Sequence, residues 1–351
     1  MWWVVFFLIL VSVMIHVLFW PTGIDPVAWT PPPAPKLTGV YARNNVLAGL
    51  ARIPVGGKAP EDVAVDNLGN LIAGLVDGRI IRVQPDGSHL VTLTHTYGRP
   101  LGIVVDGTGR ILIADANKGL LSLYPGQKPE LLVNQYKAKP LLFTNHLDVT
   151  RDGLIYFTDT STRFPLAHYT ADILENRPNG RLFSYNPVSK QLYLLLEGLY
   201  FANGVALSAD ESFLLINETS RYRIRRYWLK GPRAGEDEIF IDNLPGFPDN
   251  LSRGPSGLFW CALVSPRKPE IDFVMPYPPL RRLIYRIPER LQPKATRYAF
   301  VLGLNEQGEV VHNLQDPTGA FGEVTGVVEH EGYLYLGSLV EEAIGRIKLP
   351  T

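Results

Sequence analysis

The stretch PLGIVVDGTGRILIAD (residues 100–115) contains two apolar runs separated by a polar turn with Asp and two glycines. This arrangement is typical of two short antiparallel strands joined by a hairpin. Five further segments repeat it: PEDVAVDNLGNLIAG (60–74), TNHLDVTRDGLIYFTD (144–159), ANGVALSADESFLLIN (202–217), PDNLSRGPSGLFWCAL (248–263) and EVTGVVEHEGYLYLGS (323–338). The chain is therefore expected to be built from six similar β units.

The spacing of the units indicates how they are arranged. The residues two before the first apolar position of each unit are Glu61, Leu101, Asn145, Asn203, Asp249 and Thr325, with gaps of 40, 44, 58, 46 and 76 residues. Units of this length match four-stranded blades, two of them extended by insertions, so the sequence predicts an all-β fold, a six-bladed β-propeller. A β-sandwich is the alternative, but it gives no reason for six similar units.

Closure of the ring follows from the last unit, which supplies only three strands after Gly322. We expect residues 46–55 (VLAGLARIPV) to add the fourth strand, so that the two ends of the propeller pair and leave no open sheet edge.

The composition argues against several other classes of protein and of metal site. Of the 351 residues, 34 are basic and 34 acidic, and no basic stripe is present, so nucleic-acid binding is not expected. Cys261 is the only cysteine, which rules out an intramolecular disulfide and a cysteine-based zinc site. The 32 Gly and 29 Pro suit short strands joined by tight turns.

The first residues form a separate segment. MWWVVFFLILVSVMIHVLFW is apolar and uncharged apart from its α-amine, so we expect residues 1–21 to form a transmembrane signal-anchor helix. A cleaved signal peptide is the alternative, although a basic start and a small-residue cleavage site are not evident. Residues 22–39 are predicted to be a stiff Pro-rich linker, and residues 40–351 the propeller. The expected location is a single-pass membrane protein with its propeller on the extracytoplasmic or lumenal side.

In a propeller the first strand of each blade lines the central channel. Four of the six residues at the channel mouth carry oxygen donors: Glu61, Asn145, Asn203 and Asp249. Two carboxylates and two amide carbonyls match Ca²⁺ better than zinc or copper, so we expect a calcium site there. Each residue also has a purely local interpretation. Asn203-Gly204 is a type I′ turn signal, and Asn145 and Asp249 could form Asx turns.

Two insertions are expected to shape the channel mouth. One, around residues 164–179, contains His168, which could reach over the mouth. The other, VSPRKPEIDFVMPYPPLRRL (264–283), brings together Phe273, Met275 and Tyr277 and suggests a hydrophobic lid or a membrane-facing rim. His146 follows a proposed ligand directly and is expected to be a packed, buried histidine.

Several runs of the sequence resemble the strictosidine synthase-like family, in particular its membrane-anchored branch. They are RPLGI (99–103), ADANKGL (114–120), IYFTDTS (155–161), FANGVALS (201–208), IRRYW (224–228), PGFPDN (245–250) and EHEGYLYLGS (329–338). The resemblance runs from about Val40 to Pro350 and implies relationship to gluconolactonases and paraoxonases, which are six-bladed propellers with calcium in the central tunnel. It implies metal ligands at Glu61, Asn145, Asn203 and Asp249, with Asn250 as a secondary candidate.

The sequence departs from that family at two channel-mouth positions. Leu101 stands where paraoxonases have a catalytic His, and Thr325 stands where strictosidine synthases have a catalytic Glu, so neither histidine-assisted water activation nor amine–aldehyde condensation is expected. Both residues become candidates for lining the substrate pocket. The function expected is calcium-dependent hydrolysis of a small hydrophobic lactone or aryl ester, with Asp249 as base or nucleophile. The alternative is a calcium-stabilised binding or adhesion propeller without turnover.

Overall fold

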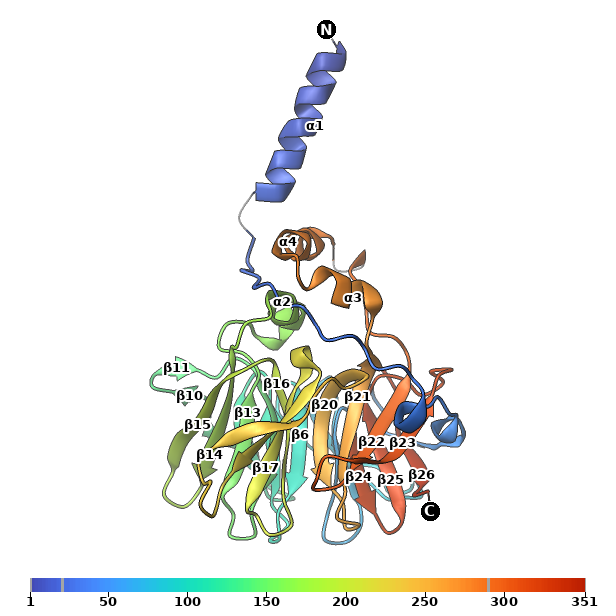
Figure 1. Cartoon of the computed structure of the whole chain (residues 1–351). Helices are drawn as coiled ribbons and strands as arrows, with labels where there is room; N and C mark the ends of the chain where they lie inside the picture. Colours follow the sequence, from blue (N-terminus) through green and yellow to red (C-terminus); the bar gives the residue numbers. More distant parts are fainter. Residues whose placement is uncertain (1, 20–21, 289–290, 351) are drawn as a thin grey trace.

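The computed structural model describes residues 2–19, 22–288 and 291–350. Within them the chain forms six four-stranded antiparallel sheets arranged around a central axis (Figure 1), which confirms the six-bladed β-propeller. Blade 1 contains β2 (Val63–Val65), β3 (Leu71–Gly74), β4 (Arg79–Val83) and β5 (Val91–His95). Blade 2 contains β6 (Pro100–Val105), β7 (Ile111–Asp115), β8 (Gly119–Leu123) and β9 (Glu130–Val133). Blade 3 contains β12 (Thr144–Val149), β13 (Ile155–Asp159), β14 (Gly180–Asn186) and β15 (Gln191–Leu199).

The second half of the ring follows the same order. Blade 4 contains β16 (Ala202–Leu207), β17 (Phe213–Glu218), β18 (Arg223–Trp228) and β19 (Asp237–Ile241). Blade 5 contains β20 (Gly246–Arg253), β21 (Phe259–Pro266), β22 (Ala299–Leu304) and β23 (Val310–Asp316). Blade 6 contains β24 (Val324–His330), β25 (Tyr333–Ser338), β26 (Ala343–Lys348) and β1 (Ala51–Pro54). A short hairpin, β10 (Gln135–Tyr136) and β11 (Lys139–Pro140), lies between blades 2 and 3.

The ring closes as expected, but with a shorter strand than residues 46–55. β1 pairs antiparallel with β26, with Ala51 opposite Arg346 and Pro54 opposite Ala343. The preceding residues form a 3₁₀ helix instead, η2 (Val46–Gly49), which buries Leu47 completely against blade residues such as Trp260 and Phe321. Because Leu47 packs into this cluster from a 3₁₀ helix, the strand begins only at Ala51.

The core lies between the blades. One apolar cluster joins Ala64, Ile72 and Ile80 of blade 1 to Ile103 and Ile113 of blade 2. Each sheet is covered on both faces by its neighbours, so its second strand is mostly buried, and β7, β13 and β17 are buried along their whole length. Because a lone blade cannot bury both faces, the ring is needed for stability.

The helices gather on one face of the propeller, which we call the upper face (Figure 1). Between β13 and β14 lie η3 (Leu166–His168) and α2 (Tyr169–Glu175), and between β21 and β22 lie α3 (Pro269–Val274) and α4 (Pro278–Arg286). The remaining 3₁₀ turns are η1 (Gly39–Tyr41) and η4 (Thr219–Arg221).

The Pro-rich linker is attached to this face and does not form a free spacer. Residues 22–38 have no regular helix or strand and run across the top of the blades (Figure 1). The backbone N–H of Val27 donates to the carbonyl of Glu175, and that of Trp29 donates to the carbonyl of Met275. Backbone hydrogen bonds to both insertions hold the linker in place.

Helix α1 (Trp2–Phe19) covers most of the predicted membrane segment, whose end residues Met1, Trp20 and Pro21 lie outside the described residues. Among the residues that the structure describes, no helix has the combination of length and apolar character required to cross a membrane.

Candidate metal centre

The channel-mouth residues are set by a repeated irregularity of the backbone. The register between first and second strands shifts in five blades, between Pro100 and Gly102, Thr144 and Leu147, Ala202 and Val205, Pro248 and Leu251, and Val324 and Val327. These shifts bracket Leu101, Asn145, Asn203, Asp249 and Thr325, and in blade 1 Glu61 lies just before β2. A β-bulge re-aims a side chain away from the normal alternation. It directs these positions toward the channel.

Asn203 therefore does not form the type I′ turn that its Asn-Gly pair allows. Both Asn203 and Gly204 lie within β16. A Cβ atom on Gly204 would lie 2.4 Å from the backbone nitrogen of Leu251, so the glycine is needed for close approach of two inner strands.

The four predicted ligands are all buried at the upper end of the channel, with 2–6% of each residue exposed. Asn203 Nδ2 donates to Asp249 Oδ1 at 2.7 Å. Glu61 is close enough that its charge raises the pKa of Asp249. Asn145 lies at the equivalent position of β12, which packs beside β16. The structure thus gathers at one level residues that are far apart in the sequence.

The amide oxygens provide a test of whether this set suits a cation. Asn145 Oδ1 and Asn203 Oδ1 are buried and accept no hydrogen bond from the described residues. Leaving a buried acceptor unpaired is costly unless an ion or water satisfies it. No group of three or more His, Cys, Asp or Glu side chains suited to a metal occurs in the described part of the chain, so any centre here depends on these amides. Carboxylates with amide carbonyls are a donor set that fits Ca²⁺.

Arg99 is a site residue that the sequence interpretation missed. Its Nη2 donates to Glu61 Oε2 at 2.7 Å, and both side chains are buried. Burial raises the pKa of Glu61 to about 7, although the positive charge of Arg99 acts to lower it. The sequence did carry a signal for this residue: Arg99 is a basic residue two positions before Leu101, in a turn that does not need a charge.

Asp249 is a buried carboxylate close to a second acidic side chain. Burial, followed by the negative charge of Glu61, raises its pKa well above the usual range for aspartate. Only its Oδ1 accepts a hydrogen bond from the described residues. The second oxygen is available for another partner.

An apolar wall stands beside the centre. Leu101 is buried with Ala116, Phe143 and Phe201, and the partly buried Leu166 and Ile173 of the η3–α2 insertion pack against this group. Phe143 and Phe201 meet edge to face with ring centroids 5.7 Å apart. Leu101 belongs to this wall, and the insertion forms its outer side.

The remaining predicted site residues differ from one another in burial and in their hydrogen bonds. Thr325 is fully buried, and its hydroxyl donates to the Glu61 carbonyl at 2.5 Å. Asn250 is buried with both amide atoms unpaired among the described residues. In the second insertion Met275 is buried, whereas Phe273 and Tyr277 are 65% and 49% exposed. His168 is exposed at the end of η3 and does not share the burial of the four ligands.

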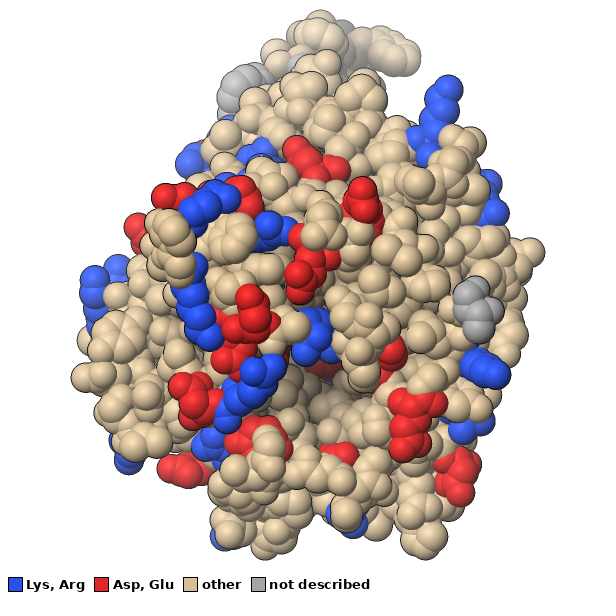
Figure 2. Space-filling view, turned by 60° about the horizontal axis from the view of Figure 1, so that its bottom comes forward, with Lys and Arg blue, Asp and Glu red and all other residues tan. Residues whose placement is uncertain are grey.

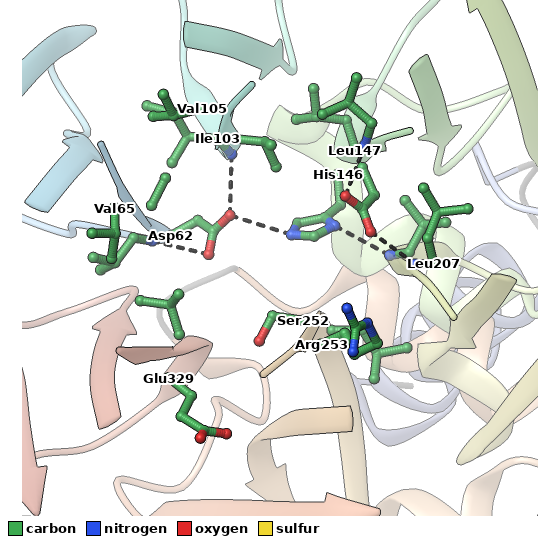
Figure 3. Close-up of a pocket in the computed structure, with 18 of the residues that line it drawn as sticks. Asp62, Val65, Ile103, Val105, His146, Leu147, Leu207, Ser252, Arg253 and Glu329 are labelled. Atoms are coloured by element: carbon green, nitrogen blue, oxygen red, sulfur yellow. Dashed lines mark hydrogen bonds and ion pairs between the residues drawn. The ribbon is translucent and has the colours of Figure 1, made fainter. Parts of the chain in front are cut away.

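A cavity of about 340 Å³ occupies the opposite, lower end of the channel. Figure 2 shows the hollow in that face, and Figure 3 shows its lining. His146 is buried, as expected. Its Nδ1 accepts from Val205 N at 3.1 Å, and its Nε2 lies 3.2 Å from Asp62 Oδ2, which also accepts from Ile103 N.

The acidic groups of the cavity have protein donors. Asp148 accepts from the backbone N–H of Val149 and Leu207, and Glu329 accepts from Ser256 and Trp260. These carboxylates link neighbouring blades, and each already accepts hydrogen bonds from the protein. The upper end of the channel, with its unpaired amide oxygens, is therefore the candidate functional site.

Comparison with known proteins agrees with this fold. The strictosidine synthase pattern matches residues 145–232, and the N-terminal pattern of strictosidine synthase-like proteins matches residues 39–83. The chain is 34% identical over 353 residues to the adipocyte plasma membrane-associated protein of Rattus norvegicus, covering 93% of each chain. This chain belongs to the strictosidine synthase-like family.

Solved structures show the same fold beyond that family. A gluconolactonase from Xanthomonas campestris superposes with a TM-score of 0.63 at 17% identity, covering 86% of this chain and 89% of that one. Regucalcin from Agrobacterium tumefaciens, described as a calcium-binding protein, superposes with a TM-score of 0.60 at 13% identity, covering 85% and 93%. At these identities the likeness establishes that this strictosidine synthase-like chain shares their propeller fold.

Proposed function

We propose that this chain is a calcium-dependent hydrolase of lactones or aryl esters, with its metal at the upper end of the channel. The observation that supports this most directly is the convergence of two buried carboxylates, Glu61 and Asp249, with the unpaired amide oxygens of Asn145 and Asn203. The two carboxylates supply negative charge for a divalent cation, although Glu61 is also paired with Arg99. The gluconolactonase and regucalcin structures, which share the fold, are consistent with this choice.

When bound, calcium would polarise the substrate carbonyl as a Lewis acid and favour ionised carboxylates around it. Glu61, Asn145, Asn203 and Asp249 would hold it. Asp249 would use the oxygen that Asn203 does not occupy to accept a proton from attacking water, or to attack the carbonyl itself. Asn203 fixes the orientation of the Asp249 carboxylate through its 2.7 Å hydrogen bond.

A hydrophobic substrate suits the surroundings of this site. The apolar wall of Leu101, Phe143 and Phe201 excludes water on one side. The exposed Phe273 and Tyr277 of the second insertion add apolar surface on the same face of the molecule. Small lactones and aryl esters match these properties, whereas Asn250 and His168 stay secondary candidates for substrate contact.

The test is hydrolysis of lactones and aryl acetates by the full-length protein with and without a calcium chelator. We expect the chelator to abolish activity, and Asp249→Asn to lower kcat/KM roughly 10²–10⁴-fold because a base or nucleophile is lost. Asp242→Asn, which neutralises an exposed carboxylate, is the matched control and should keep activity.

Two outcomes would contradict the proposal. Full hydrolysis in the presence of chelator would exclude the metal mechanism. A protein that gains thermal stability from calcium but hydrolyses no substrate of the panel would instead be a binding propeller.

We also propose that the protein associates with a membrane through α1, with the propeller on the extracytoplasmic or lumenal side. The described side chains at the start of α1 are apolar and exposed, including Trp2, Trp3, Phe6 and Phe7. The family relative in Rattus norvegicus is named as a plasma membrane-associated protein.

A further inference from the structure

Thr160 determines which way the Asn145 amide faces. The Thr160 hydroxyl lies 2.7 Å from the backbone carbonyl of Ala202 in the next blade and 2.9 Å from the Asn145 amide. A carbonyl oxygen cannot donate, so the only hydroxyl proton is committed to Ala202 and the hydroxyl can only accept from the amide. The atom facing Thr160 must therefore be the Asn145 NH₂ group. Its carbonyl oxygen is turned away from Thr160 and is buried without a hydrogen-bond partner among the described residues.

Thr219 makes the same arrangement in the next blade. Its hydroxyl lies 2.6 Å from the carbonyl of Pro248 and 3.2 Å from Asn203 Nδ2. The proton is again committed to the neighbouring blade, so the amide must present its NH₂ group to the threonine. Here Asp249 Oδ1 also accepts from Nδ2, at 2.7 Å, and reinforces the same orientation.

The two threonines hold equivalent places in their blades. Thr160 follows β13 directly and Thr219 follows β17 directly, 15 and 16 residues after the asparagines that they contact. Each hydroxyl bridges an asparagine of its own blade to a backbone carbonyl of the following blade. Blade assembly is thus coupled to the orientation of an amide.

We infer that Thr160 and Thr219 are positioning residues that turn the carbonyl oxygens of Asn145 and Asn203 toward a cation at the channel mouth. This inference rests on the proposed calcium site. A cation attracts the amide oxygen and repels the NH₂ group, so an asparagine that is free to rotate about its terminal bond binds less well than one whose NH₂ group is already held. In the described part of the chain Thr160 is the one side chain that holds the Asn145 NH₂ group, whereas the Asn203 NH₂ group is held by both Thr219 and Asp249.

The experiment measures calcium affinity of the full-length protein by calorimetric titration, without relying on activity. Thr160→Val keeps the side-chain shape and removes the hydroxyl, so we expect calcium to bind about 10–100-fold more weakly. Thr219→Val should weaken binding less, because Asp249 still orients Asn203. Thr160→Ser retains the hydroxyl and should restore an affinity near that of the unmodified protein.

Thr158→Val is the matched control. The Thr158 hydroxyl also bonds a carbonyl of the next blade, the backbone carbonyl of Asn203 at 2.7 Å, but within the described residues it makes no hydrogen bond to a ligand side chain. We expect Thr158→Val and Thr160→Val to have similar melting temperatures in chelator and different calcium affinities. Equal calcium affinities would overturn the positioning role while leaving the metal site intact. Absence of calcium binding by the unmodified protein would overturn the proposed function itself.

Discussion

Asp172 is a buried carboxyl group whose ionisation affects stability. It is 1% exposed, and its Oδ2 accepts from Ser161 Oγ at 2.5 Å and Asn179 Nδ2 at 3.1 Å. Burial raises its pKa to about 7. Because the raised pKa favours the protonated carboxyl in the folded state, its stabilising contribution is complete below about pH 4 and is lost as pH rises to about 7. The free energy of unfolding of Asp172→Asn, measured relative to that of the native protein, should therefore rise by on the order of 2–4 kcal/mol as pH increases from 4 to 8. Urea unfolding at several pH values measures this difference, and the exposed Asp86→Asn is the control. A difference that does not change with pH would contradict the prediction.

The inner strands alternate between glycine and larger residues just after the channel-mouth position. The six residues, in blade order, are Asp62, Gly102, His146, Gly204, Asn250 and Gly326. A Cβ atom on Gly204 would lie 2.6 Å from the carbonyl carbon of Asn250, and one on Gly326 would lie 2.5 Å from Asp62 Oδ1. The three glycines thus let the inner strands of neighbouring blades approach closely, with Gly204 against the backbone of blade 5 and Gly326 against the Asp62 side chain. Gly204→Ala should lower the free energy of unfolding by roughly 1–3 kcal/mol because backbone atoms must shift. Gly107→Ala, in an open turn, should change it by less than about 0.5 kcal/mol, and equal effects in denaturant titrations would refute the packing argument.

At the scale of the whole molecule, the upper face carries the insertions, the linker and α1 together (Figure 1). Apolar side chains are exposed both on α1 and at Phe273 and Tyr277, so the channel mouth and the proposed membrane contact share one side of the ring.

We expect the full-length protein to float with phospholipid vesicles in a density gradient. Replacing Trp2, Trp3, Phe6 and Phe7 by serine should reduce the bound fraction several-fold, since burial of each large apolar side chain contributes roughly 1.5–3 kcal/mol. Equal flotation of the two proteins would show that α1 does not provide the attachment.

The propeller could be predicted because its signal is local. Each unit pairs two adjacent strands through a short turn, so alternating apolar residues and Asp-Gly turns reveal it without knowledge of distant contacts. The ring closure by β1 was also predictable from the missing strand of the last blade. The limits of that strand were not, because burial of Leu47 against Trp260 and Phe321 draws the chain into η2.

The sequence by itself determined the six-unit repeat, the positions of the insertions and the oxygen-bearing residues at the channel mouth. Tertiary structure decided the Arg99–Glu61 pair, the hydrogen bond between Asn203 and Asp249, and the direction in which each asparagine amide faces. It also decided that the linker lies on the propeller. The physical reason is that strand formation depends on neighbours along the chain, whereas ion pairing, amide orientation and burial depend on atoms brought together only when the blades close into a ring.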